Sequence, residues 1–268
     1  MSILHSTKIY AEEAITEFDE NMAINFFGNY KMGVFAQNDS KEYATDLPWN
    51  GGVGIRYKDI SAQISVPVSF NDWAFDFEIS SYFDKIYFEG FLKHYKKLYD
   101  EDFNEQSDLD IVSSGIRATW VNNHTNHSLS SVLRMDKKQN ASSGSLLYGF
   151  GVFYSSIHSK MERIERYIER QHLMYFGPSI GYSYIWVFSN GIFINLSLNL
   201  LPNLGINTNK DRLLFAPQWE PRIIFGHHNH TWSINLIMMN NCTVLLWNKN
   251  DYDMLQLISV TIMFSKRL

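Results

Sequence analysis

Residues 172–200, HLMYFGPSIGYSYIWVFSNGIFINLSLNL, alternate between large apolar and small or polar side chains in two runs. In the first run every even position from Met174 to Phe188 is apolar, and in the second every even position from Ile192 to Leu200 is apolar. The turn residues Ser189, Asn190 and Gly191 separate the runs. Because successive side chains of a strand point to opposite faces, this stretch predicts a β-hairpin with one apolar and one polar face.

The same alternation recurs along most of the chain. It covers 22–34, 53–57, 60–68, 73–80, 112–120, 146–154, 215–225, 232–238 and 258–264, with less regular strands over 86–98 and 127–135. Segments of about ten residues with this period, separated by turns, are the signature of a transmembrane barrel. We therefore predict an all-β fold, a single antiparallel transmembrane β-barrel of about 12 strands (between about 10 and 14), with short turns on one side and longer loops on the other.

The strand pattern divides the chain into a polar N-terminal segment, residues 1–20, and an outer-membrane β-barrel, residues 21–268. Only the stretch KMERIERYIERQ, residues 160–171, has helical spacing, as a loop helix or as the extended ends of a long hairpin. Pro67, Pro178, Pro217 and Pro221 fall inside predicted strands, where we expect bulges or strand ends. The first residues lack a signal peptide, so we expect a mature form, or a recombinant one, with an added Met.

Composition excludes several classes of function. The chain contains no run of about 18 apolar residues, which argues against transmembrane helices. A net charge of −5 gives no reason to expect nucleic acid as a partner. Cys242 is the single cysteine and can form no internal disulfide. No phosphate-binding glycine loop, paired-cysteine motif or cofactor motif is present, so we expect neither a cofactor nor a metal, and the sequence favours a role without enzymatic activity.

The polar face distinguishes a membrane barrel from a soluble one. It consists mainly of Ser, Asn, Gly, Gln and Thr, whereas soluble surfaces are rich in Lys and Glu. Charged residues mixed into this face are expected to line the lumen, where they either neutralise one another or line a narrow wet pore. These are Arg56, Asp76, Glu78, Glu89, Lys93, Arg117, Arg134, Glu220 and Arg222.

Aromatic residues on the apolar face are expected to face lipid, with those near strand ends forming interfacial girdles. The candidates are Trp73, Trp120, Tyr182, Tyr184, Trp186, Phe188, Trp219 and Trp232. The acidic N-terminal segment is a possible source of a plug for the lumen.

Two histidine groups are the only other candidates for chemistry. His227, His228 and His230 could bind zinc or copper, but no Cys or carboxylate lies close in sequence, so a polar turn at the barrel rim is the better interpretation. His124, His127 and Ser128 suggest a lipid hydrolase, but neighbours in a strand point to opposite faces, so His127 cannot activate Ser128. We therefore assign no catalytic residue.

Four segments resemble an uncharacterised family of bacterial proteins, a domain of unknown function thought to form outer-membrane barrels. They are GVGIRYKDIS (52–61), NHSLSS (126–131), ASSGSLLYG (141–149) and FGPSIGYSYIWVF (176–188). The resemblance covers most of the chain after residue 50 and implies a fold and a location in a bacterium with two membranes, but no catalytic residue.

We expect an integral outer-membrane barrel in contact with membrane lipid or detergent, acting as a narrow, porin-like channel or transport barrel for small solutes, or as a structural barrel. The alternatives are an outer-membrane lipid hydrolase, which needs a Ser and a His on adjacent strands at the lipid boundary, and a soluble lipid-binding β-barrel. The sequence identifies neither protein partners nor an oligomeric state.

Overall fold

The structure is a computed structural model of the 268-residue chain. It describes residues 13–37, 41–45, 49–68, 75–83, 85–96, 98–100, 110–158, 171–209, 212–248 and 251–268. The candidate helix at 160–171 therefore lies outside the described residues, apart from Gln171, which begins a strand.

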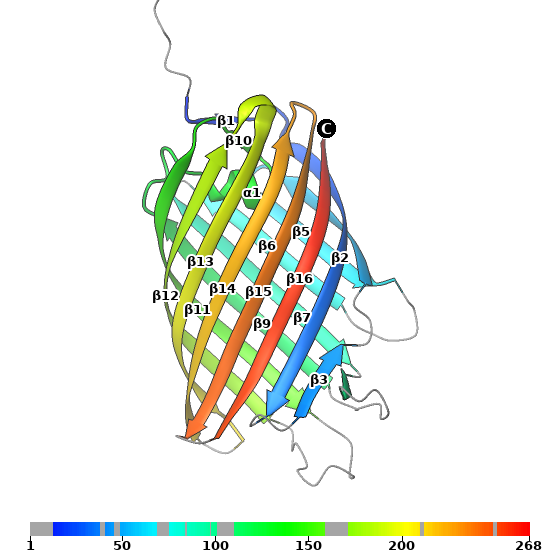
Figure 1. The fold of residues 1–268 in the computed structure, drawn as a ribbon, viewed down its shortest axis with the longest axis vertical. Coiled ribbons are helices and arrows are strands. Elements are labelled where there is room, and N and C mark those ends of the chain that lie inside the picture. The colour runs from blue at the N-terminus through cyan, green and yellow to red at the C-terminus, as the bar shows by residue number, and fades with distance from the viewer. Residues whose placement is uncertain are drawn as a thin grey trace, which may run out of the picture.

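Twelve antiparallel strands form a closed β-barrel, which confirms the predicted fold class (Figure 1). They are β2 (Met22–Gln37), β4 (Trp49–Tyr57), β5 (Ile60–Pro67), β6 (Phe75–Phe83), β7 (Ile86–Lys96), β9 (Asp110–Val121), β11 (Ser143–His158), β12 (Gln171–Val187), β13 (Ile192–Asn207), β14 (Arg212–His228), β15 (Trp232–Asn248) and β16 (Asp251–Arg267). Each strand pairs with the next in this order, and β16 pairs with β2 to close the barrel. The short strands β3 (Lys41–Thr45) and β8 (Leu98–Asp100) extend the sheet beside β2.

Tight connections and the C-terminus lie at one end of the barrel, at the top of Figure 1. Lys58 and Asp59 join β4 to β5, and the short 3₁₀ turn η1 (Ser189–Gly191) joins β12 to β13. Asn190 and Gly191 both have positive φ in this turn, a conformation that Asn and Gly adopt more readily than other residues. We call this end of the barrel the turn end, and the end that carries β3 the loop end.

The apolar stripes face outward. Val53, Phe150 and Leu198 are each between 44% and 52% exposed, whereas inward neighbours such as Ser183, Asn195 and Asn203 are 0–1% exposed. A continuous apolar exterior of this size is not stable in water, but it matches the hydrocarbon region of a bilayer. The orientation contradicts a soluble lipid-binding barrel, in which the apolar side would enclose the ligand.

Prolines interrupt the ladders without shifting their register. Pairing between β12 and β13 is missing at 177–179 opposite 201–203, a stretch that contains Pro178 and Pro202. The β14–β15 ladder likewise lacks pairs at 216–217 and 220–221, which contain Pro217 and Pro221. Pro67 is the last residue of β5, as expected of a strand end. Each proline removes one backbone donor, so the local loss of pairs follows from the residue itself.

The predicted strand over 127–135 is wrong. The connection from β9 to β11 instead folds into the lumen at the turn end and contains the five-residue helix α1 (Leu129–Leu133) and the strand β10 (Lys137–Gln139). We call residues 122–142 the plug. Leu129, Val132 and Leu133 have the i, i+3, i+4 spacing of a helix face, which explains why this segment does not form a strand. Ser128 caps the helix by accepting a hydrogen bond from the Ser131 amide at 3.1 Å.

Of the N-terminal segment, the structure describes residues 13–20, which contribute a strand. Its strand β1 (Ile15–Glu17) pairs with β10 of the plug at the turn end of the barrel. Within the described part of the chain, the helices are too short and too polar to cross a membrane.

We expect a charge on the outer wall to destabilise the barrel according to its depth. Leu198→Arg, near the middle of β13, should lower the free energy of unfolding in lipid vesicles by about 2–4 kcal/mol. Ile192→Arg, at the turn end of the same outward face, is the matched control and should cost about 0–1 kcal/mol. Urea titrations followed by the gel mobility of unboiled samples measure both values. Equal costs at the two positions would contradict the membrane orientation.

Candidate functional site

A cavity of about 240 Å³ occupies the lumen on the loop side of the plug. Its wall is formed by residues of β2, β5, β6, β7, β9, β11, β12, β14, β15 and β16, and Leu133 of α1 is the plug residue that contacts it. The wall carries ion pairs, amides and an apolar region, so the site combines three kinds of chemistry in one enclosed space.

Two ion pairs lie on the β2–β7 side of the cavity. Lys31 on β2 forms a buried ion pair with Asp76 on β6, and Asp76 also accepts a hydrogen bond from the Tyr95 hydroxyl at 3.2 Å. The Nζ of Lys93 lies 3.4 Å from Oε1 of Glu78. The other carboxylate oxygen of Glu78, Oε2, accepts a hydrogen bond from the side-chain amide of Gln63 at 2.6 Å. These partners compensate the cost of burying charge.

Arg117 on β9 connects two sides of the lumen. It forms ion pairs with Glu89 on the adjacent strand β7 and with Glu220 on β14, across the barrel. Gln218 and Asn241 also donate hydrogen bonds to Glu220, at 2.8 and 3.0 Å. Glu220 thereby accepts hydrogen bonds from three residues, which fix the position of the carboxylate.

Arg222 on β14 also lines the cavity but has a weaker partner. Its guanidinium donates to the sulfur of Met239 at 3.5 Å. Among the residues that the structure describes, no carboxylate lies within 4.0 Å of this group. Thioether sulfur is a poor acceptor, so Arg222 retains most of its hydrogen-bonding capacity.

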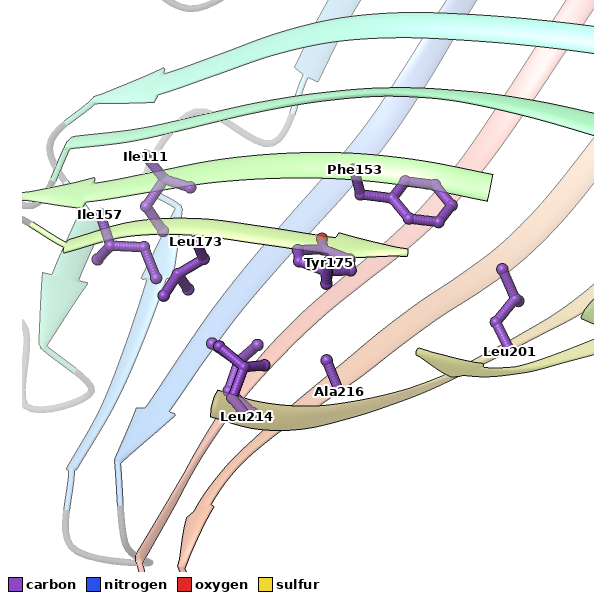
Figure 2. Close-up of a cluster of buried hydrophobic side chains, with 9 residues drawn as sticks. Ile111, Phe153, Ile157, Leu173, Tyr175, Leu201, Leu214 and Ala216 are labelled. Carbon is purple, nitrogen blue, oxygen red and sulfur yellow. The ribbon is translucent and has the colours of Figure 1, made fainter. Parts of the chain in front are cut away.

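An apolar cluster lies inside the barrel toward the loop end (Figure 2). Its members point inward from β9, β11, β12, β13, β14 and β15 and are Ile111, Phe153, Ile157, Leu173, Tyr175, Leu201, Leu214, Ala216 and Leu245. The rings of Phe153 and Tyr175 stack with centroids 5.3 Å apart. Ile111, Phe153 and Tyr175 also line the cavity, which therefore has an apolar wall next to its charged one.

Apolar contacts anchor the plug to the barrel wall. Leu129 packs among Tyr82, Tyr87, Val121 and Leu147, and Val132 packs among Ile185, Phe193 and Ile224. Leu133 contacts both groups. The plug therefore covers the lumen at the turn end as a packed core.

Polar contacts join the plug to the same wall. Asn235 donates to the Val132 carbonyl at 2.8 Å, and Arg134 of the plug donates to the Lys58 carbonyl at 2.8 Å. Arg267 donates to the Met135 carbonyl at 3.3 Å. Orphan carbonyls at the end of a short helix require such partners, and here the barrel supplies them.

His127 is a fully buried residue of the plug. Its Nδ1 lies 3.2 Å from both the carbonyl and the hydroxyl oxygen of Ser143. Burial lowers its pKa from 6.5 to about 4, so the ring is neutral at pH 7. Because His127 and Ser128 are buried inside the lumen, a membrane lipid cannot reach them as a hydrolytic pair.

The structure places the predicted charged residues in two groups. Seven line the cavity, namely Asp76, Glu78, Glu89, Lys93, Arg117, Glu220 and Arg222. Arg56 and Arg134 are buried at the turn end, where Arg56 donates to the Glu20 carbonyl at 3.4 Å. Lys31 was not a predicted site residue, although the alternation over 22–34 places it on the polar face.

The aromatic candidates lie on the outer wall where they are described. Trp120, Tyr182, Trp186, Phe188 and Trp219 are 36–50% exposed. Tyr184 and Trp232 are partly exposed, and Trp73 lies outside the described residues. The inward apolar cluster was not predicted, because Phe153 and Leu173 occupy the face that elsewhere carries Ser and Asn.

The histidines of the β14–β15 turn diverge. His228 points inward, stacks on Phe193 with centroids 4.7 Å apart and contacts the Ser233 hydroxyl at 2.8 Å. His227 instead packs against Trp232. In the described part of the chain no three His, Cys, Asp or Glu side chains are grouped to hold a metal ion.

Residues 12–263 match the sequence model of a family described as "Domain of unknown function (DUF4421)", which confirms the family resemblance. No curated protein matches the sequence at a significant level.

Several solved outer-membrane barrels match the fold over almost their full length. A bacterial polysaccharide outer membrane secretin is 8% identical with a TM-score of 0.42, and the match covers 93% of this chain and 99% of that chain. The outer membrane protease OmpT from Escherichia coli is 7% identical with a TM-score of 0.40, covering 94% and 98%. An outer membrane channel from Pseudomonas putida F1 is 8% identical with a TM-score of 0.39, also covering 94% and 98%. At these values the function has to be argued from the chain's own residues.

Removing the guanidinium of Arg117, which pairs with two carboxylates, should destabilise the barrel. Arg117→Met leaves Glu89 and Glu220 without their common partner, and we expect the free energy of unfolding to fall by about 3–5 kcal/mol. Adding Glu89→Gln and Glu220→Gln to the same variant should recover most of this loss, because the buried charges are then gone. Urea unfolding in lipid vesicles measures both. An unchanged stability of Arg117→Met would contradict the structural role of the network.

The plug should loosen as the pH falls. His127 has a pKa of about 4 in the closed plug and near 6.5 once the plug is released. The stability that the neutral ring contributes to the closed plug is therefore complete above pH 6.5 and is lost as the pH falls toward 4. We expect hydrogen exchange of the α1 amides, corrected for intrinsic rates, to accelerate roughly tenfold or more between pH 7 and pH 5. His127→Asn keeps a donor for Ser143 and should remove this share of the pH dependence. An identical pH profile in the variant would overturn the assignment to His127.

Proposed function

This chain belongs to the family of the domain of unknown function DUF4421, and since that description assigns no activity, we propose a function from the lumen itself. The proposed function is a narrow, plugged transport barrel for small solutes in a bacterial outer membrane. The observation that supports it best is the lumenal cavity, which is lined by ion pairs and an apolar wall and which the plug contacts at Leu133.

The exterior supports the location. Its band of exposed aliphatic and aromatic side chains requires lipid or detergent, and an even number of antiparallel strands is typical of bacterial outer-membrane barrels. Short turns in such barrels lie on the periplasmic side. The turn end, with its plug and both β1 and the C-terminus, is therefore the periplasmic end in this proposal.

The bound plug favours a gated lumen rather than a permanently open pore. Helix α1 is bound to the wall by two apolar clusters and by side-chain hydrogen bonds from Asn235, Arg134 and Arg267. Passage of a solute therefore requires the plug to move or rearrange. The wall beyond the plug carries balanced ion pairs, which tolerate water and suit a hydrated path.

A hydrolase is less well supported. The candidate pair His127 and Ser128 lies within the plug, and Ser128 serves as the cap of α1. A structural barrel without transport remains the alternative that the following experiment distinguishes.

We expect the barrel to conduct ions when the plug is removed. Replacing residues 123–141 by Asn-Gly shortens the connection between the paired residues Val121 and Leu147 to eight residues, and the two strands are already antiparallel neighbours. Single-channel recording in planar bilayers should show at least a tenfold larger conductance than the full chain, because the periplasmic end is then open. The control Ala141→Gly/Ser142→Gly changes two exposed plug residues and should stay closed. A folded plug-free barrel with no conductance would favour the structural barrel.

A further inference from the structure

We infer that the lumenal cavity binds a small amphipathic organic anion, with its acidic group at Arg222 and its hydrocarbon part against Phe91, Phe153 and Leu255. The inference rests on the proposed function and names the class of solute. It follows from Arg222, the cavity cation that has no carboxylate partner among the residues that the structure describes, and from the apolar wall of the same cavity.

The carboxylates of the cavity are already occupied. Asp76 is bound by Lys31 and Tyr95, and Glu78 by Lys93 and Gln63. Glu89 and Glu220 share Arg117. Each of these carboxylates therefore already has a cationic partner, although Oδ1 of Asp76 accepts no hydrogen bond in the described structure, and a cationic solute would share the cavity with the guanidinium of Arg222. The cavity is therefore electrostatically suited to an anion.

Arg222 has the geometry to bind such an anion. A guanidinium presents a planar fork of donors that matches a carboxylate, a sulfonate or a phosphate. Its contact with the Met239 sulfur orients the side chain without using up the fork. A bound anionic group would supply the charge-assisted hydrogen bonds that this residue lacks in the described structure.

The apolar wall indicates that the anion carries a hydrocarbon portion. Many inward positions of the described strands carry Ser, Asn, Gly or Thr, as a hydrated path needs. Phe91 and Phe153 instead face each other with centroids 6.3 Å apart, and Leu255 packs against the same cluster. All three line the same cavity as Arg222, and the inference is that one molecule contacts both regions.

The volume limits the size of the solute. A cavity of about 240 Å³ lies below the range of about 300–1,000 Å³ that drug-sized ligands occupy. A single chain of several carbons with one acidic group fits this limit better than a fused-ring molecule or an oligosaccharide. Octanoate is a suitable probe because it has one carboxylate and a flexible chain.

Equilibrium dialysis with radiolabelled octanoate tests the inference on the full chain in lipid nanodiscs, with empty nanodiscs subtracted. We expect saturable binding of one octanoate per barrel, with octan-1-ol and octylammonium binding at least tenfold more weakly. Acetate at the same concentration should fail to displace octanoate, because it lacks the hydrocarbon chain. Equal binding of octanoate and octan-1-ol would overturn the role of the anionic group.

Two variants assign the effect to Arg222. Arg222→Gln should weaken octanoate binding at least tenfold, and Arg222→Lys should restore part of it by returning the positive charge. Lys266→Gln removes the same charge from an exposed position outside the cavity and should leave binding unchanged. Unboiled gel mobility verifies that each variant is folded. Unchanged binding by folded Arg222→Gln would overturn the inference.

Different results would refute the anion site and the proposed transport function. A plug-free barrel that conducts ions while the full chain binds no octanoate would refute the anion site and leave the transport barrel standing. Octanoate binding that depends on Arg222, together with a plug-free barrel that does not conduct, would support the site and refute the channel.

Discussion

The pairing of β16 with β2 is the constraint on which the rest of the structure depends. It runs from Arg267 opposite Ala23 to Asp253 opposite Gln37 and removes the last two edges of the sheet. A bilayer offers no partner to an unpaired backbone group, so the wall is stable in lipid only when it is closed. In the closed barrel one face of each strand meets lipid and the other faces a confined lumen, so the direction of a side chain determines its environment.

A confined lumen requires each buried charge to have a partner, and the two ends of the barrel meet this requirement differently. In the cavity, Lys31 and Arg117 are paired with carboxylates. At the turn end, Arg134 and Arg267 donate mainly to backbone carbonyls of the turns and the plug, at distances of 2.7–3.3 Å. Arg222 follows neither pattern, which is why it stands out as a group whose partner comes from outside the chain.

The fold could be predicted from sequence where the pattern is local. Leu198 and Ser197 differ in face because period two is a property of neighbouring residues, but the strands extend beyond the alternating stretches, as β15 continues from 238 to Asn248. The plug could not be predicted in this way, since the burial of Val132 depends on Phe193 and Ile224, which are distant in sequence. The ion pairs are similar: the pattern placed Arg117 and Glu220 on the lumenal face, but only the closed sheet brings β9 and β14 across from each other.

Contacts on the side opposite the cavity also hold the plug. Strand β1 pairs with β10, Asn140 donates to the Glu13 carbonyl at 2.8 Å, and Phe18 lies over the guanidinium of Arg267 at 3.3 Å. A solute in the cavity contacts the plug at Leu133 alone. A ligand shifts a conformational equilibrium only through contacts that differ between the two states. We therefore expect a bound solute to shift the equilibrium between the closed and the open plug only slightly. A change in the β1–β10 pairing at the turn end, by contrast, acts directly on the segment that closes the lumen.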